Sequence, residues 1–166
     1  MSADFLDELA ELALGSRLKR LSDRLMTEAN SIYQAFGHSM QPRWFGLLAL
    51  LYRRGEVAVV EAADLLGISQ PAISQFSRDL EKQGWVTVEQ AANDGRKRLL
   101  TLTASGRQEV ASLQTMWQAV DLAAKELCEE TGGDFYQSIQ RFERALKRKS
   151  LLDRALAQVE DKHHDD

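Results

Sequence analysis

Apolar residues recur at intervals of three and four along most of the chain, which is the spacing of one face of an α-helix. The first such stretch covers residues 4–36, with Gly15 as the expected bend or junction, and the second covers residues 43–54. Two more helical stretches follow at residues 107–130 and 134–159. The pattern therefore predicts a mainly α-helical protein with long N- and C-terminal helices.

Residues 59–83 predict two shorter helices that are joined by a tight turn. The first helix is expected to end at Gly67, because a residue without Cβ adopts the left-handed backbone that closes a helix. Ser69 or Gln70 then begins the second helix, and Pro71 lies in its first turn, where the missing N–H does no harm. This arrangement is typical of a helix-turn-helix.

The second of these helices has one apolar and one polar face. Ile73, Phe76 and Leu80 share a stripe that we expect to be buried. The opposite side chains can bond base edges, since Gln suits adenine and Arg suits guanine, and Lys82 is better placed for a phosphate. The candidate DNA-contacting residues of this helix are Ser69, Gln70, Ser74, Gln75, Arg78 and Lys82. Any surface helix has a polar face, so this feature alone does not establish DNA binding.

A basic β-hairpin is predicted directly after the second helix. Two strands, at residues 84–90 and 99–103, flank the turn at 93–95, and Val57 is expected to add a short third strand. The hairpin tip holds three consecutive cations, namely Arg96, Lys97 and Arg98. Such a ribbon suits the minor groove, whose negative potential favours arginine. The alternative is a charged turn that only improves solubility.

The length of 166 residues suits one domain over residues 1–166, and the net charge of −4 is unexpected for a DNA-binding protein. The charge is unevenly distributed, however. Residues 94–107 carry four Lys or Arg and one Asp, whereas residues 108–166 carry eight Lys or Arg and twelve Asp or Glu. The hairpin end is therefore the part of the chain that we expect to face DNA.

Several classes of function are not supported by the composition. The nearly apolar stretch at 44–52 is too short to span a bilayer, and the N-terminus lacks a secretory pattern, which predicts a soluble cytoplasmic protein with no membrane partner. The lone Cys128 has acidic neighbours and is expected to be a packing residue rather than a redox sensor. The chain has no predicted metal site, cofactor or catalytic constellation, so we do not expect an enzyme.

The terminal helices at 1–36 and 107–160 carry apolar stripes that no other part of the chain is expected to cover. We therefore expect them to pair with the same helices of a second copy in a two-fold dimer. Two reading helices held about one helical turn apart would then contact a pseudo-palindromic DNA site.

Residues 63–69, 77–86 and 94–106 resemble the MarR family of bacterial transcription regulators. The most specific element is the wing, because residues 94–96 match the family's Asp-x-Arg and residues 102–106 match its Leu-Thr-x-x-Gly. The resemblance implies a dimeric winged helix-turn-helix, with the DNA-binding region at 43–106. It also implies that Arg96 enters the minor groove and that Asp94 orients Arg96 or a nearby arginine.

The resemblance further implies a response to a small molecule or an oxidant, although the first helix lacks the cysteine of the redox-sensing members. An aromatic cluster at the junction of the first two helices is the candidate effector pocket. It contains Tyr33, Phe36, His38, Arg43 and Trp44, with Phe45 and Trp117 as further walls. One arginine among aromatic rings would suit a small aromatic or anionic effector. A packed core would contain similar residues, and Arg43 could instead pair with an acid.

The sequence therefore predicts a sequence-specific regulator that binds double-stranded DNA, a homodimeric repressor that reads a pseudo-palindromic operator and responds to an effector. The alternative is a winged-helix module used for protein–protein association, which the negative net charge permits. Affinity for random duplex DNA that falls steeply with salt would distinguish the first function from the second.

Overall fold

The structure, a computed structural model, describes residues 4–91 and 94–162. The chain divides into two units, Met1–Gln114 and Thr115–Asp166, and the boundary falls inside a long helix. The elements in chain order are α1 (Phe5–Glu8), η1 (Ala10–Ala13), α2 (Leu14–Ala35), η2 (Pro42–Trp44), α3 (Phe45–Arg54), β1 (Val57–Ala58), α4 (Val59–Leu66), α5 (Gln70–Lys82), β2 (Val86–Ala91), β3 (Asp94–Leu102), α6 (Ala104–Glu130), α7 (Phe135–Arg148) and α8 (Leu151–Lys162). The predicted mainly α-helical fold with a small β-hairpin is confirmed.

The N-terminal helical stretch is interrupted over residues 10–13, and α2 begins at Leu14, next to Gly15, where we expected a bend or junction. Ala10 has a φ of 46°, in the left-handed region, and separates α1 from α2 together with the short 3₁₀ segment η1. Gly15 lies inside α2. Ion pairs join the two sides of the break, because Asp4 contacts Arg20 and Asp7 contacts Arg17. These pairs link α1 and the residue before it to the start of α2.

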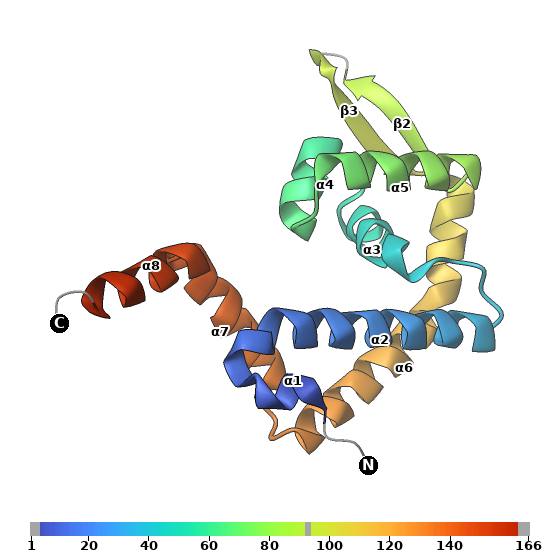
Figure 1. The fold of residues 1–166 in the computed structure, drawn as a ribbon. Coiled ribbons are helices and arrows are strands. Elements are labelled where there is room, and N and C mark those ends of the chain that lie inside the picture. Colours follow the sequence, from blue (N-terminus) through green and yellow to red (C-terminus); the bar gives the residue numbers. More distant parts are fainter. Residues whose placement is uncertain (1–3, 92–93, 163–166) are drawn as a thin grey trace. The chain divides into compact units, whose positions relative to one another are not determined.

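Helices α3, α4 and α5 and a small sheet form the winged helix in the unit Met1–Gln114 (Figure 1). The described strands form one antiparallel sheet in the order β1-β3-β2. Val57 of β1 lies opposite Leu100 of β3, and Val86 of β2 lies opposite Leu102. The predicted third strand at Val57 is therefore confirmed, and Figure 1 shows the β2–β3 hairpin extending beyond α5.

Apolar residues of all these elements meet in one core. Ile73 and Leu80 of α5 are fully buried as predicted, whereas Phe76 is only half-buried. Small Ala63 on α4 is buried too, in agreement with a close crossing of α4 and α5. The rings of Trp44 and Trp85 meet edge to face, with centroids 6.2 Å apart. This core fixes the orientation of α5 relative to the sheet.

The last helical stretch consists of two helices, α7 and α8, whereas we predicted one continuous helix. Lys149 has extended backbone, and Ser150 begins the new helix: its Oγ accepts a hydrogen bond from the Asp153 N–H at 3.1 Å. The same hydroxyl donates to the Asp153 carboxylate at 2.6 Å, which lowers the pKa of that carboxyl below its ordinary value. Ser150 therefore caps the N-terminus of α8, directly after the extended residue that ends α7.

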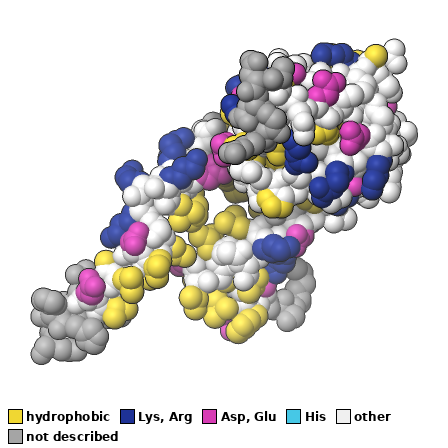
Figure 2. All heavy atoms as spheres, turned by 90° about the horizontal axis from the view of Figure 1, so that it is seen from above, with side chains coloured by type: hydrophobic (Ala, Val, Ile, Leu, Met, Phe, Trp, Pro, Cys, Tyr) yellow, Lys and Arg dark blue, Asp and Glu magenta, His cyan; other side chains and the backbone are white. Residues whose placement is uncertain are grey.

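Helices α7 and α8 leave an apolar stripe on the surface. Figure 2 shows hydrophobic side chains gathered along one side of this part of the chain, and Lys and Arg side chains along another. The exposed apolar residues are Phe135, Tyr136, Ile139, Phe142, Leu146, Leu151, Leu152, Leu156 and Val159. Gly132 and Gly133, which both have positive φ, separate α6 from α7 between the predicted helical stretches at 107–130 and 134–159. Within the described ranges, the helices are not long and apolar enough to cross a membrane.

Candidate nucleic-acid interface

The turn between α4 and α5 is closed by the residues that the sequence indicated. Gly67 adopts the left-handed conformation, with a φ of 65° and a ψ of 29°, and the Ile68 N–H donates to the Ala63 carbonyl at 3.1 Å. Ser69 is the N-cap of α5, and its Oγ accepts a hydrogen bond from the Ala72 N–H at 3.3 Å. Pro71 lies in the first turn. The two helices are therefore joined as a helix-turn-helix requires.

We expect Ser69→Ala to destabilise the protein by about 1 kcal/mol, because the N-terminal N–H groups of α5 lose the side-chain acceptor. Ser69→Asp supplies another good N-cap acceptor and should retain most of the stability. Urea unfolding of the two variants and of the wild type measures the difference. Equal stability of Ser69→Ala and the wild type would contradict this role of the hydroxyl.

The predicted polar face of α5 is accessible to a partner. Gln70, Gln75, Arg78 and Lys82 are exposed, and Ser74 is half-buried. The core residues of the same helix point to the opposite side, as the helical spacing requires. The structure therefore places the candidate base-contacting residues on one open surface of α5, with Lys82 in its last turn.

Polar side chains on this surface are linked to one another. The Gln75 Nε2 donates to Asp79 Oδ1 at 2.9 Å, and the Arg78 Nη2 donates to Gln75 Oε1 at 2.6 Å. Arg43 Nη2 lies 3.5 Å from Asp79 Oδ2. Asp79 was not among the predicted site residues. The signal that could have found it is its position four residues after Gln75, which places both side chains together on a helix.

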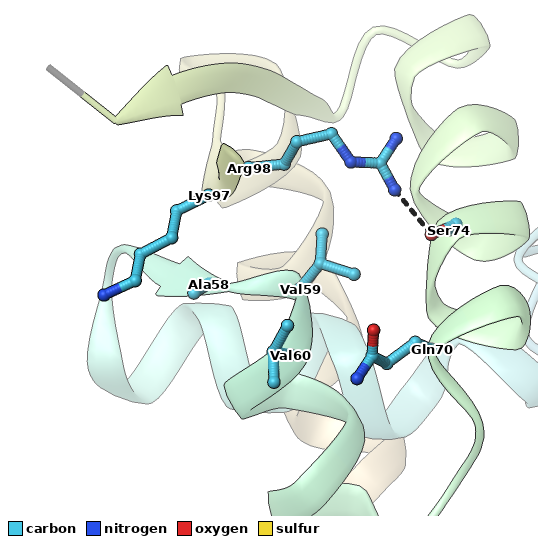
Figure 3. Close-up of a pocket in the computed structure, with 7 residues that line it drawn as sticks. All are labelled: Ala58, Val59, Val60, Gln70, Ser74, Lys97 and Arg98. Atoms are coloured by element: carbon cyan, nitrogen blue, oxygen red, sulfur yellow. Dashed lines mark hydrogen bonds between the residues drawn. The ribbon is translucent and has the colours of Figure 1, made fainter. Parts of the chain in front are cut away.

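A pocket of about 240 Å³ lies between α5 and the wing. Figure 3 shows Arg98 reaching from β3 toward Ser74, and the Arg98 Nη2 donates to Ser74 Oγ at 2.5 Å. The lining residues are Ala58, Val59, Val60, Gln70, Ser74, Lys97 and Arg98. The structure thus brings two predicted helix residues and two predicted wing residues into one pocket. The side chains of Asp94 and Arg96, and the whole of Asn93, lie outside the described part of the chain.

The residues of the predicted effector pocket have different environments. Tyr33 and Trp44 are buried, whereas Phe36 and Phe45 are exposed. His38 is half-buried, with its Nδ1 3.7 Å from Glu109 Oε1. Trp117 belongs to the other unit.

Arg43 pairs with an acid, which was one of the alternatives that the sequence left open. Its guanidinium carbon lies 5.8 Å from the centre of the Trp44 ring system and 6.0 Å from that of Phe76, besides the contact with Asp79. These contacts direct Arg43 toward α5 and give it a role in supporting that helix.

This arrangement resembles that of a known protein family. Residues 38–97 match the model of the MarR family, and this range contains α3, α4, α5, β2 and the start of β3. None of the curated proteins matches the chain in sequence.

Solved structures with the same fold include protein–DNA complexes. The MepR–DNA complex of S. aureus has a TM-score of 0.68 and 19% sequence identity, covering 80% of this chain and 97% of that chain. Reduced AbfR bound to DNA has a TM-score of 0.66 and 20% identity, covering 87% and 98%. The transcriptional regulator BldR from Sulfolobus solfataricus has a TM-score of 0.63 and 18% identity, covering 88% and 99%. The chain therefore resembles the MarR family over residues 38–97, and its fold is the winged-helix fold of these solved structures.

Proposed function

We propose that this protein is a sequence-specific regulator that binds double-stranded DNA and represses transcription as a homodimer. The observation that most directly supports the proposal is the surface shared by α5 and the wing strand β3. One pocket there is lined by Gln70, Ser74, Lys97 and Arg98. Glutamine and serine can bond base edges, and the two cations can bind phosphates. Two similar folds occur in complexes with DNA, which agrees with this use of the surface.

In the proposed complex, α5 enters the major groove, where Gln75 reads adenine and Arg78 reads guanine. Lys82 and Arg98 bind phosphates and position the helix. The wing follows the backbone, and Arg96 inserts into the minor groove, where the negative potential favours arginine. The hydrogen bond from Arg98 to Ser74 supports this division of roles, because it ties the wing to the reading helix.

Exposed apolar residues on the terminal helices support the homodimer. Leu14, Leu18, Leu21 and Leu25 follow one another on α2 at helical spacing, and each is at least 37% exposed. The apolar stripe of α7 and α8 is exposed as well, and exposed apolar stripes of this kind mark interaction surfaces. A second copy with the same stripes would bury them, and a two-fold dimer would present two α5 helices to one operator.

We also infer that a small aromatic or anionic effector regulates DNA binding in the cytoplasm. The exposed guanidinium of Arg43, held beside the Trp44 and Phe76 rings, supports an anionic or aromatic ligand at this position. Because Arg43 also contacts Asp79 of α5, a ligand that drew Arg43 away would act on the reading helix directly.

We expect Arg78→Ala to relax sequence preference at one base step and to lower operator affinity by about 1–3 kcal/mol, because one guanine contact is lost. The measurement is a gel-shift titration with a duplex that the wild-type protein selects from random sequences, and with variants of that duplex at each position. Unchanged affinity and preference of Arg78→Ala would contradict the assignment of α5 as the reading helix.

A further inference from the structure

Asp79 is an acid on the helix that we propose to enter the major groove, where a carboxylate repels phosphates. Its side chain is 21% exposed, and contacts engage both of its oxygens. Oδ1 accepts from Gln75 Nε2 at 2.9 Å, and Oδ2 lies 3.5 Å from Arg43 Nη2. A negative charge on this helix weakens DNA binding, so we ask what Asp79 contributes to recognition in return.

The contacts of Asp79 and Arg78 fix the orientation of the amide of Gln75. A glutamine amide can rotate and exchange its donor and acceptor ends, so a free Gln reads bases ambiguously. A carboxylate only accepts hydrogen bonds, so the NH₂ of Gln75 must face Asp79. A guanidinium only donates, so the oxygen of Gln75 must face Arg78. The two neighbours therefore select the same orientation.

The oriented side chains keep enough hydrogen-bonding capacity to read bases. Gln75 retains one N–H on Nε2 and one lone pair on Oε1, which is the pattern that bonds N7 and N6 of adenine. Arg78 uses one of its N–H groups on Gln75 and retains others for O6 and N7 of guanine. Because Arg78 and Gln75 bond each other, the two base contacts are coupled.

Arg43 holds Asp79 in place and offsets its charge. The guanidinium of Arg43 lies over the buried Trp44 and the half-buried Phe76, at 5.8 and 6.0 Å from the ring centres. These ring contacts hold Arg43, a residue of η2, in place for its 3.5 Å contact with Asp79. The carboxylate is therefore positioned in part by Arg43, a residue outside α5.

We propose that Asp79 is a positioning residue that sets base specificity by orienting Gln75, with Arg43 as its support. The inference rests on the proposed function, since it assumes that Gln75 and Arg78 contact bases. Asp79 touches no base itself. Its removal therefore changes which sequences are preferred, while the general attraction to DNA remains.

Two neutral variants whose side chains have the same number of heavy atoms as Asp separate orientation from charge. Asp79→Asn keeps a hydrogen-bond acceptor for Gln75, and Asp79→Leu has none; both remove the same negative charge. The variant Gln75→Ala is measured first. The operator position at which it loses the base preference of the wild type is the position that Gln75 reads. Full-length proteins are then titrated with the selected duplex, with base variants at that position, and with random duplex DNA.

We expect Asp79→Leu to lose about tenfold in discrimination at that position, which corresponds to one bidentate base contact. Asp79→Asn should lose less, because its amide oxygen can still accept from Gln75, although its NH₂ group no longer excludes the opposite orientation. Both variants should bind random duplex as tightly as the wild type or more tightly, because a negative charge near the phosphates is gone. Asp79→Ala replaces Asp79→Leu if the leucine variant does not fold, as judged by circular dichroism.

Two results would overturn the inference: discrimination by Asp79→Leu within twofold of the wild type, or an equal loss of binding to selected and random duplexes. The second result would mean that Asp79 only stabilises the fold. Failure of the proposed function has a different signature, because the wild-type protein itself would then select no duplex sequence.

Discussion

Gly106→Ala is expected to destabilise the protein by about 3 kcal/mol or more. A Cβ at this position would lie 2.0 Å from the carbonyl oxygen of Trp85 and 2.8 Å from its carbonyl carbon, and a backbone group cannot move aside cheaply. The same junction contains Thr103, whose Oγ1 donates to the Gly84 carbonyl at 2.7 Å and accepts from the Gly106 N–H at 2.9 Å. Urea unfolding measures the loss.

Gly15→Ala is the matched control for this substitution. Gly15 also lies in a helix, but a Cβ there would meet no atom within 4 Å. We expect the control to be neutral or to stabilise the protein by about 0.5–1 kcal/mol, since alanine has the higher helix propensity. If Gly106→Ala were as stable as the control, Gly106 of α6 would not lie against the Trp85 carbonyl group.

The double substitution Lys97→Ala/Arg98→Ala is expected to weaken binding to random duplex DNA and to flatten its salt dependence. Each phosphate contact adds about 0.9 to the slope of log affinity against log salt, so losing two contacts should reduce the slope by about 1.8. Loss of Arg98 also breaks the link from the wing to Ser74. Fluorescence anisotropy titrations at several salt concentrations provide the slope.

Lys19→Ala/Arg24→Ala removes the same charge from α2 and serves as the control. Both side chains are well exposed, at 74% and 79%, and each pairs with an acid four residues along the helix. Such surface pairs contribute little to stability. The control should keep the wild-type slope. A wing variant whose slope equals that of the wild type would show that the wing does not contact phosphates.

Local signals in the sequence were sufficient to predict the helix-turn-helix and the wing. Gly67, Ser69 and Pro71 each have a conformational preference that acts within a few residues, so their effects can be read without knowledge of the fold. The exposed polar face of α5 could be predicted for the same reason, because Ile73 and Leu80 define the buried side by their spacing alone.

The features that the sequence did not predict depend on side-chain contacts, which the spacing of apolar residues does not reveal. The break at Ala10 is accompanied by ion pairs from Asp4 and Asp7 to arginines on the next helix. The break before α8 leaves the apolar spacing intact, and only the pair of Ser150 and Asp153 marks it. The contact between Arg43 and Asp79 joins α5 to residues more than thirty positions earlier, so the sequence left its existence open.

Selection of bound sequences from a random duplex library with the purified full-length protein tests the central claim most directly. We predict enrichment of an inverted repeat whose half-sites are about 10 base pairs apart, which reports a reading helix and a two-fold dimer together. Affinity for the unselected library should fall steeply with salt. No enriched motif, together with no duplex binding at low salt, would contradict the account and favour a winged helix that binds another protein.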